Sequence, residues 1–214
     1  MSLIKKDLAE AINEAIAATD ANGEPIKVTP EMETYAEAII TTLTTSTFSH
    51  LLVEGVTAPG APLQNGAANG GLFLPPLPPA TWLGVLTAGF PTADPASLSI
   101  EATCSTTYLS GASLVNFEAG KIVGQCTSAP LAPGPLAAGA GSDGKIDGID
   151  GDSWASVCVP PPGDPALASK IYKAIVKYIK ANAEAAYLPQ TINGVCPPGG
   201  GPLAAGLGVG GTVI

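Results

Sequence analysis

The amino-acid sequence predicts a mainly α-helical fold with extensive irregular loops and little β-structure. Several segments begin with a capping residue and proline and then carry apolar residues at helical spacing. Between them the chain is rich in glycine and proline, and its 26 glycines and 21 prolines make up more than a fifth of its 214 residues. Only 5% of the residues are aromatic, so few bulky side chains can anchor these loops. We therefore expect a single helical domain with long loops.

The longest predicted helix runs from Asp164 to Leu188. Asp164 is a typical N-cap, Pro165 suits the first helical position, and Pro189 would end the helix. One face of this helix is apolar and contains Leu167, Ile171, Ile175, Tyr178 and Ile179. The opposite face carries four lysines, Lys170, Lys173, Lys177 and Lys180. We expect the apolar face to be buried and the lysines to face solvent or an acidic neighbouring protein.

The same signals predict shorter helices elsewhere. Apolar residues at every fourth position predict a helix from Ser2 to about Thr19. The pairs Thr29-Pro30 and Asp94-Pro95 each place an N-cap before proline and predict helices that begin there. The second of these runs to about Tyr108, although its many threonines and serines leave a strand open. A short helix is expected over residues 80–88 and a helical turn over 154–158, whereas residues 48–56 fit either a helical turn or a strand.

The predicted organisation is a helical domain over residues 1–188 and an extended C-terminal arm over residues 189–214. Within the domain, residues 55–93 contain no charged side chain, and residues 111–163 form a second Gly/Pro loop. No charged side chain follows Glu184. Because long uncharged loops are rarely left in water, we expect the loop and the arm to lie against neighbouring subunits. The predicted contacts of the arm are Leu203, Leu207, Val209, Val213 and Ile214.

Two short stretches of sequence occur twice. Residues 120–124 (GKIVG) resemble residues 144–148 (GKIDG), and PLAAG occurs at residues 135–139 and again at 202–206. Both are too short and too unevenly spaced for a solenoid repeat. We interpret them as low complexity in preference to a true duplication.

The charge balance argues against nucleic-acid binding. The net charge is −9, and all nine basic residues are lysines. Because proteins that bind DNA or RNA use a positive field and often arginine side chains, we expect no direct contact with nucleic acid. The N-terminus lacks a signal-peptide pattern, and no segment has the length and apolar composition of a membrane span. We therefore expect synthesis in the cytoplasm and no membrane contact.

The chain has four widely spaced cysteines, Cys104, Cys126, Cys158 and Cys196. No two of them have C-x-x-C spacing and the chain has one histidine, so we expect no zinc site. Four cysteines can form two disulfides in three connectivities. Four buried, unreactive thiols are the alternative. The sequence does not decide between these arrangements.

No residue pattern points to catalysis, and we expect neither enzymatic activity nor a cofactor. His50 is not accompanied by a nucleophile motif, which favours a structural role. Four aspartates lie between Asp143 and Asp152, but an EF-hand loop counted from Asp143 would place Lys145 at a ligand position and Trp154 where the bidentate glutamate belongs. A solvated acidic turn is favoured over a metal site, and the question of calcium stays open.

Three stretches of the sequence resemble small structural proteins of tailed-bacteriophage particles: LAEAI (8–12), GKIDGIDGDSWA (144–155) and a small-residue tail that ends in GTVI (211–214). The resemblance implies a multi-copy accessory component of the head, neck, tail or baseplate. Such a component is located in the virion, assembles with copies of itself and with other virion proteins, and has no enzymatic activity. Low charge and an uncharged loop also suit an assembly subunit.

Two other hypotheses come from the residues. The first is a disulfide-stabilised extracellular binding or adhesion module, which the four cysteines would allow. The second, less favoured, is an enzyme that uses His50, the one histidine of the chain.

Overall fold

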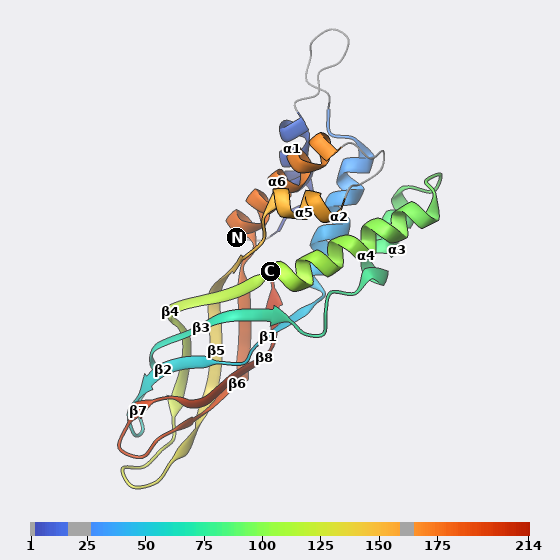
Figure 1. Ribbon diagram of the computed structural model, residues 1–214. Coiled ribbons are helices and arrows are strands. Elements are labelled where there is room, and N and C mark those ends of the chain that lie inside the picture. The colour runs from blue at the N-terminus through green and yellow to red at the C-terminus, as the bar shows by residue number, and fades with distance from the viewer. Residues whose placement is uncertain (1–2, 17–26, 159–164) are drawn as a thin grey trace. The chain divides into compact units, whose positions relative to one another are not determined.

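The computed structural model describes residues 3–16, 27–158 and 165–214 (Figure 1). These residues form two compact units, and the chain passes through each of them three times. The helical unit contains residues 1–46, 76–113 and 148–183, and the barrel unit contains residues 47–75, 114–147 and 184–214. Helix accounts for 41% of the structure and strand for 37%. The expectation of a mainly α-helical fold with little β-structure is therefore wrong.

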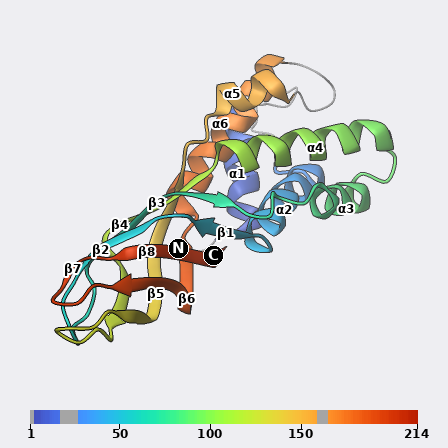
Figure 2. The same cartoon turned by 60° about the horizontal axis from the view of Figure 1, so that its bottom comes forward.

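The helical unit consists of three consecutive helix pairs. They are α1 (Lys5–Ile16) with α2 (Pro30–Thr44), α3 (Pro79–Gly89) with α4 (Pro95–Ala112), and α5 (Gly151–Val157) with α6 (Pro165–Asn182). Each helix packs against the next, and α6 packs against α1, so the six helices form a ring (Figure 2). Thr29 caps α2 and Asp94 caps α4 through side-chain oxygens that accept backbone N–H groups. Both predicted helix starts are confirmed.

Helix α6 is shorter than predicted. It ends at Asn182, before the expected end at Leu188. Residues 185–188 instead begin a strand, which continues through Pro189. The expected N-cap, Asp164, lies outside the described residues. Much of the predicted apolar face is buried, including Ile175 and Ile179.

The barrel unit is built of strands, which the sequence left open over residues 48–56 but did not predict in the rest of this unit. They are β1 (Thr47–His50), β2 (Val53–Thr57), β3 (Gln64–Phe73), β4 (Leu114–Cys126), β5 (Gly134–Asp147), β6 (Ala185–Cys196), β7 (Gly201–Pro202) and β8 (Ala204–Val213). Strands β1, β8, β6, β5, β4 and β3 close into an antiparallel barrel, to which β2 and β7 add. The expected loop 55–93 thus contains β3 and α3, and the expected loop 111–163 contains β4, β5 and α5.

The predicted C-terminal arm is also wrong. Strand β6 pairs with β5 and β8, and β8 pairs with β1 of the same chain. The backbone groups that were expected to reach a neighbouring subunit are therefore used within the barrel. Small side chains suit this placement, because strands built from glycine and alanine can approach one another closely.

Three hairpins of the barrel share one register. In each, an apolar residue of the first strand pairs with a small residue of the returning strand: Val53 with Ala68, Ile122 with Gly141, and Ile192 with Gly208. The pattern Pro-Leu-x-x-Gly spans or closely follows the start of each returning strand, at residues 62–66, 135–139 and 202–206. The fourth residue of each pattern has a positive φ, at 50° for Asn65, 51° for Ala138 and 46° for Ala205. The barrel is therefore a threefold repeat of one hairpin.

The glycine that ends each pattern marks where one hairpin crosses the next. A Cβ on Gly66 would overlap the carbonyl oxygen of Ile122, and a Cβ on Gly139 would overlap that of Ile192. A Cβ on Gly206 would overlap the carbonyl oxygen of Val53, in the first hairpin. The third repeat thus returns to the first and closes the ring, and only glycine permits this approach.

The whole chain follows the same threefold order, because a helix pair precedes each hairpin. The PLAAG echo at residues 135–139 and 202–206 occupies equivalent positions, so its interpretation as low complexity is wrong. The other echo has no such basis, since residues 120–124 lie within β4 and residues 144–148 lie at the end of β5 and beyond it.

Candidate functional site

Three aromatic rings lie at equivalent positions inside the barrel. His50 pairs with Gly208, Phe117 with Ala68, and Tyr187 with Gly141. The three ring centroids are 5.6 Å (His50 to Phe117), 5.7 Å (His50 to Tyr187) and 5.5 Å (Phe117 to Tyr187) apart. They form a nearly equilateral triangle, in which the first repeat contributes histidine.

Both ring nitrogens of His50 have a hydrogen-bond partner in the barrel, and one of these partners belongs to the triangle. Nε2 lies 2.7 Å from the carbonyl oxygen of Val115, and Nδ1 lies 2.9 Å from the hydroxyl of Tyr187. Because the carbonyl can only accept, we assign the proton to Nε2, so that Nδ1 accepts from Tyr187. Burial lowers the pKa of His50 and favours this neutral form. These contacts give His50 a structural part in the barrel core.

The helical unit has a polar centre made by one residue from the second helix of each pair. These residues are Tyr35 of α2, Glu101 of α4 and Tyr172 of α6. Glu101 is only 4% exposed. Its carboxylate accepts from the Tyr35 hydroxyl, from Tyr172 Oη at 3.1 Å and from Ser105 Oγ at 2.7 Å. Burial and then the Glu101 charge raise the pKa of both tyrosines, which keeps them protonated as donors.

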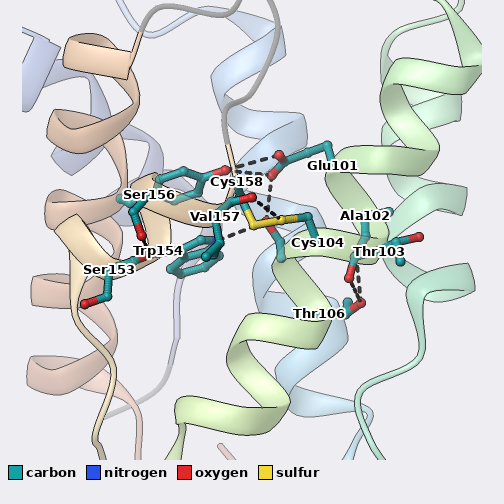
Figure 3. The surroundings of a disulfide bond; sticks show 12 residues. Glu101, Ala102, Thr103, Cys104, Thr106, Ser153, Trp154, Ser156, Val157 and Cys158 are labelled. Atoms are coloured by element: carbon teal, nitrogen blue, oxygen red, sulfur yellow. Dashed lines mark hydrogen bonds between the residues drawn. A yellow bond between two sulfur atoms is a disulfide. The ribbon is translucent and has the colours of Figure 1, made fainter.

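Stacked rings and a disulfide hold this centre. The ring of Trp154 stacks on Tyr172 at 4.5 Å and on Tyr108 at 5.4 Å, and its Nε1 donates to Ser105 Oγ at 3.1 Å. The disulfide between Cys104 and Cys158 joins α4 to the end of α5 beside Trp154 (Figure 3). The position of the Glu101 carboxylate is therefore fixed from several sides.

Glu101 is a buried carboxylate. Among the described residues no cation pairs with it, because each ion pair there is made by a different acidic side chain. It lines a pocket of about 300 Å³ formed by α2, α3, α4 and the α3–α4 connection. The lining residues are Tyr35, Leu86, Phe90, Ala93, Asp94, Ser97, Leu98 and Glu101. No sequence pattern pointed to this site, although Glu101 is the one charged residue within α4.

The cysteines form two disulfides, one within each unit. Cys104 bonds to Cys158, and Cys126 bonds to Cys196, with Cα atoms 5.7 Å and 5.8 Å apart. Of the two arrangements that the sequence left open, the disulfides are confirmed and the four thiols are wrong. The sequence had left all three connectivities open.

The four predicted lysines lie on one exposed face of α6. Lys173 forms an ion pair with Asp152 at 2.8 Å. Lys170, Lys173 and Lys177 line a groove of about 560 Å³ beside α1, which contributes Glu14. Their contact with an acidic neighbour stays a prediction.

The predicted contact residues of the arm fall into two groups. Leu203 and Val213 are buried in the barrel, so they are not accessible to another protein. Leu207, Val209 and Ile214 remain exposed, at 37%, 50% and 50%.

The aspartates of residues 143–152 do not gather into one site. Asp143 and Asp147 belong to the barrel unit, whereas Asp150 and Asp152 belong to the helical unit. Asp143 pairs with Lys121 at 2.6 Å, and Asp150 caps α5. In the described part of the chain, no group of three or more His, Cys, Asp or Glu side chains is arranged to hold a metal ion.

The three hairpins end in uncharged loops at one end of the barrel (Figures 1 and 2). No charged residue occurs in residues 55–75, 122–142 or 185–214, and Leu131 in the second loop is 96% exposed. Gln125 Nε2 donates to the Gly60 carbonyl at 2.7 Å, and the Cys126–Cys196 disulfide joins the second and third hairpins. We call residues 58–63, 127–133 and 197–203 the loop end.

No protein-family model, curated protein or solved structure matches this chain. Among the described helices, none has the length and apolar character needed to cross a membrane.

Proposed function

We propose that the chain is a non-enzymatic structural subunit of a tailed-phage particle and that it contacts other virion proteins through the loop end of the barrel. The observation that carries this proposal is the threefold repeat of uncharged, exposed hairpin loops. The resemblance of the sequence to phage structural proteins supports the proposed location in a phage particle. The threefold repeat supports the proposed contact through the loop end.

A ring of three similar hairpins presents a similar surface three times. Such a surface suits a partner with threefold symmetry, because matching contacts can then form at each repeat. Proteins bury exposed apolar surface of low charge when they associate. Leu131, together with the prolines of the three loops, provides such a surface at the loop end. We also propose that the lysines of α6 contact acidic side chains of neighbouring copies of the chain.

The proposal is tested on phage particles released by the cells that produce this protein. Particles purified on a density gradient are probed with an antibody raised against the purified chain. We expect the chain to sediment with intact particles and to remain after a high-salt wash. Recovery of the chain only from the soluble fraction of the lysate would contradict the proposal.

The contact surface is tested with one charged substitution in each unit. Leu131→Asp, in the loop end, should reduce incorporation into particles strongly, because it would bury an unpaired charge. Ile100→Asp is the matched control, since Ile100 is 70% exposed on α4. Equal incorporation of both variants would exclude the loop end as the contact surface.

The two disulfides favour a second candidate, an extracellular binding or adhesion module. Fractionation of the source distinguishes it from the first. An extracellular module would be recovered from the medium or the cell surface without phage particles.

A further inference from the structure

The helical unit contains a buried charge that the rest of the described chain does not neutralise. Three hydroxyl groups donate to the Glu101 carboxylate, from Tyr35, Tyr172 and Ser105. Hydroxyl donors reduce the cost of burying a carboxylate, but a cation offsets it far more. The carboxylate also has capacity left, because among the described residues its Oε2 has a hydrogen-bond contact only with Tyr172.

The pocket that Glu101 lines has room for a small molecule. The pocket of about 300 Å³ is at the lower end of the sizes of ligand sites in proteins. Its apolar wall is made of Leu86, Phe90, Ala93 and Leu98. Its polar groups include two acids, the buried Glu101 and the exposed Asp94, and its lining, drawn from the described residues, contains no lysine.

We propose that this pocket binds a small organic ammonium ion, with the charged nitrogen at the Glu101 carboxylate and a short apolar group against Phe90 and Leu98. The negative charge of Glu101 favours a cation and disfavours a carboxylate or phosphate ligand, whereas the Asp94 carboxylate is engaged in capping α4. The aromatic rings of Phe90 and Tyr35 add an attraction for positive charge. The site lies in the helical unit and does not depend on the proposed role of the loop end.

The threefold repeat explains how such a site could arise. Tyr35, Glu101 and Tyr172 each come from the second helix of a pair, and one carboxylate stands between two tyrosines. In three identical chains an acid at this position would meet two other acids, and their repulsion would be costly. Within one chain the three positions can differ, so a single acid can stand between two tyrosines and recognise a single cation.

The test uses n-butylammonium as the probe and 1-butanol as its uncharged match. Each is titrated into the purified full-length chain at pH 7 and followed by NMR shifts of the backbone amides of Phe90, Ala93, Asp94, Ser97 and Leu98. We expect saturable binding of n-butylammonium that is at least about ten-fold tighter than that of 1-butanol, because both can donate to the carboxylate but only the ammonium brings a positive charge to it. Absence of saturable binding, or equal affinities, would overturn the proposal.

Two variants locate the site. Glu101→Gln should remove the preference for n-butylammonium over 1-butanol, whereas Glu54→Gln, at an exposed position on β2, should leave it unchanged. If Glu101→Gln does not fold, Ala93→Phe decides, because it keeps the carboxylate and fills the pocket. Ala93→Phe should abolish binding of both probes, and unchanged binding in it would place the ammonium elsewhere and overturn the proposal.

Discussion

The barrel unit is built of three hairpins and the helical unit of three helix pairs. The hairpins are more alike than the helix pairs. In the barrel the three hairpins keep the same register and the same glycine crossings. In the helical unit the equivalent central residues differ, since they are Tyr35, Glu101 and Tyr172. The helices also differ in length, from 7 residues in α5 to 18 in α6. Strand pairing fixes register through the backbone, whereas helix packing depends on side chains. Divergent chemistry is therefore concentrated in the helical unit.

The barrel has one comparable departure from its repeat. His50 stands where the other hairpins have Phe117 and Tyr187, and its hydrogen bond to Tyr187 joins the two polar rings of the triangle. This pair is neutral and internally satisfied. The centre of the helical unit instead carries an acid beside a pocket, which makes it the better candidate for ligand binding.

The largest predicted effect compares the two disulfides. Cys104→Ser with Cys158→Ser, and separately Cys126→Ser with Cys196→Ser, should each lower the free energy of unfolding by about 4 kcal/mol, since the bonds close loops of similar length. Chemical denaturation of the two double variants measures this loss. A much smaller loss for one pair would show that its unit is not stabilised by restriction of the unfolded chain.

The next effect compares the two polar centres. Tyr172→Phe removes a donor from the Glu101 carboxylate and should cost about 2 kcal/mol, because hydrogen bonds to charged groups are stronger. Tyr187→Phe removes a donor from neutral His50 and should cost about 1 kcal/mol. Denaturation curves of the two variants provide the comparison. A larger cost for Tyr187→Phe would contradict the assignment of a charged centre to the helical unit alone.

We expect the stability of the barrel to depend on pH through His50. Burial depresses the pKa of His50 in the folded chain, so the folded state binds fewer protons than the unfolded state in the affected range. The stability contributed by neutral His50 is present above about pH 6.5 and is lost as the pH falls below it. His50→Phe should remove this part of the acid dependence, measured as denaturation midpoints between pH 7 and pH 5. An unchanged slope in the variant would show that His50 does not titrate in this way.

The smallest effect is expected on the lysine face of α6. Lys170→Ala and Lys177→Ala should leave the unfolding midpoint unchanged within error, because both side chains are exposed to solvent. A clear loss of stability in either variant would show that the groove beside α1 depends on these charges.

The sequence predicted the helices far better than the strands. Thr29-Pro30 and Asp94-Pro95 carry capping signals that depend only on local residues, and both helices begin as predicted. The strands lack the β-branched and aromatic residues that normally mark them, and β8 reads AAGLGVGGTV. Their small residues reflect the close crossing of hairpins, which is a tertiary property.

The threefold repeat was partly visible in the sequence. The pattern Pro-Leu-x-x-Gly occurs a third time at residues 62–66, where Gln64 and Asn65 replace the two alanines of the other copies. Recognising that third copy would have indicated a triplication. The Glu101 site was harder to find, since Tyr35, Glu101 and Tyr172 are far apart in the chain and meet only after the helices form a ring.

The central claim is that three equivalent hairpins close one barrel, and a glycine series tests it most directly. Gly66→Ala, Gly139→Ala and Gly206→Ala are made separately, and the free energy of unfolding of each is measured by chemical denaturation. Because each new Cβ would overlap the carbonyl oxygen of the next hairpin, we predict similar losses of about 1–3 kcal/mol in all three variants. Full tolerance of one substitution beside large losses for the other two would contradict the threefold account.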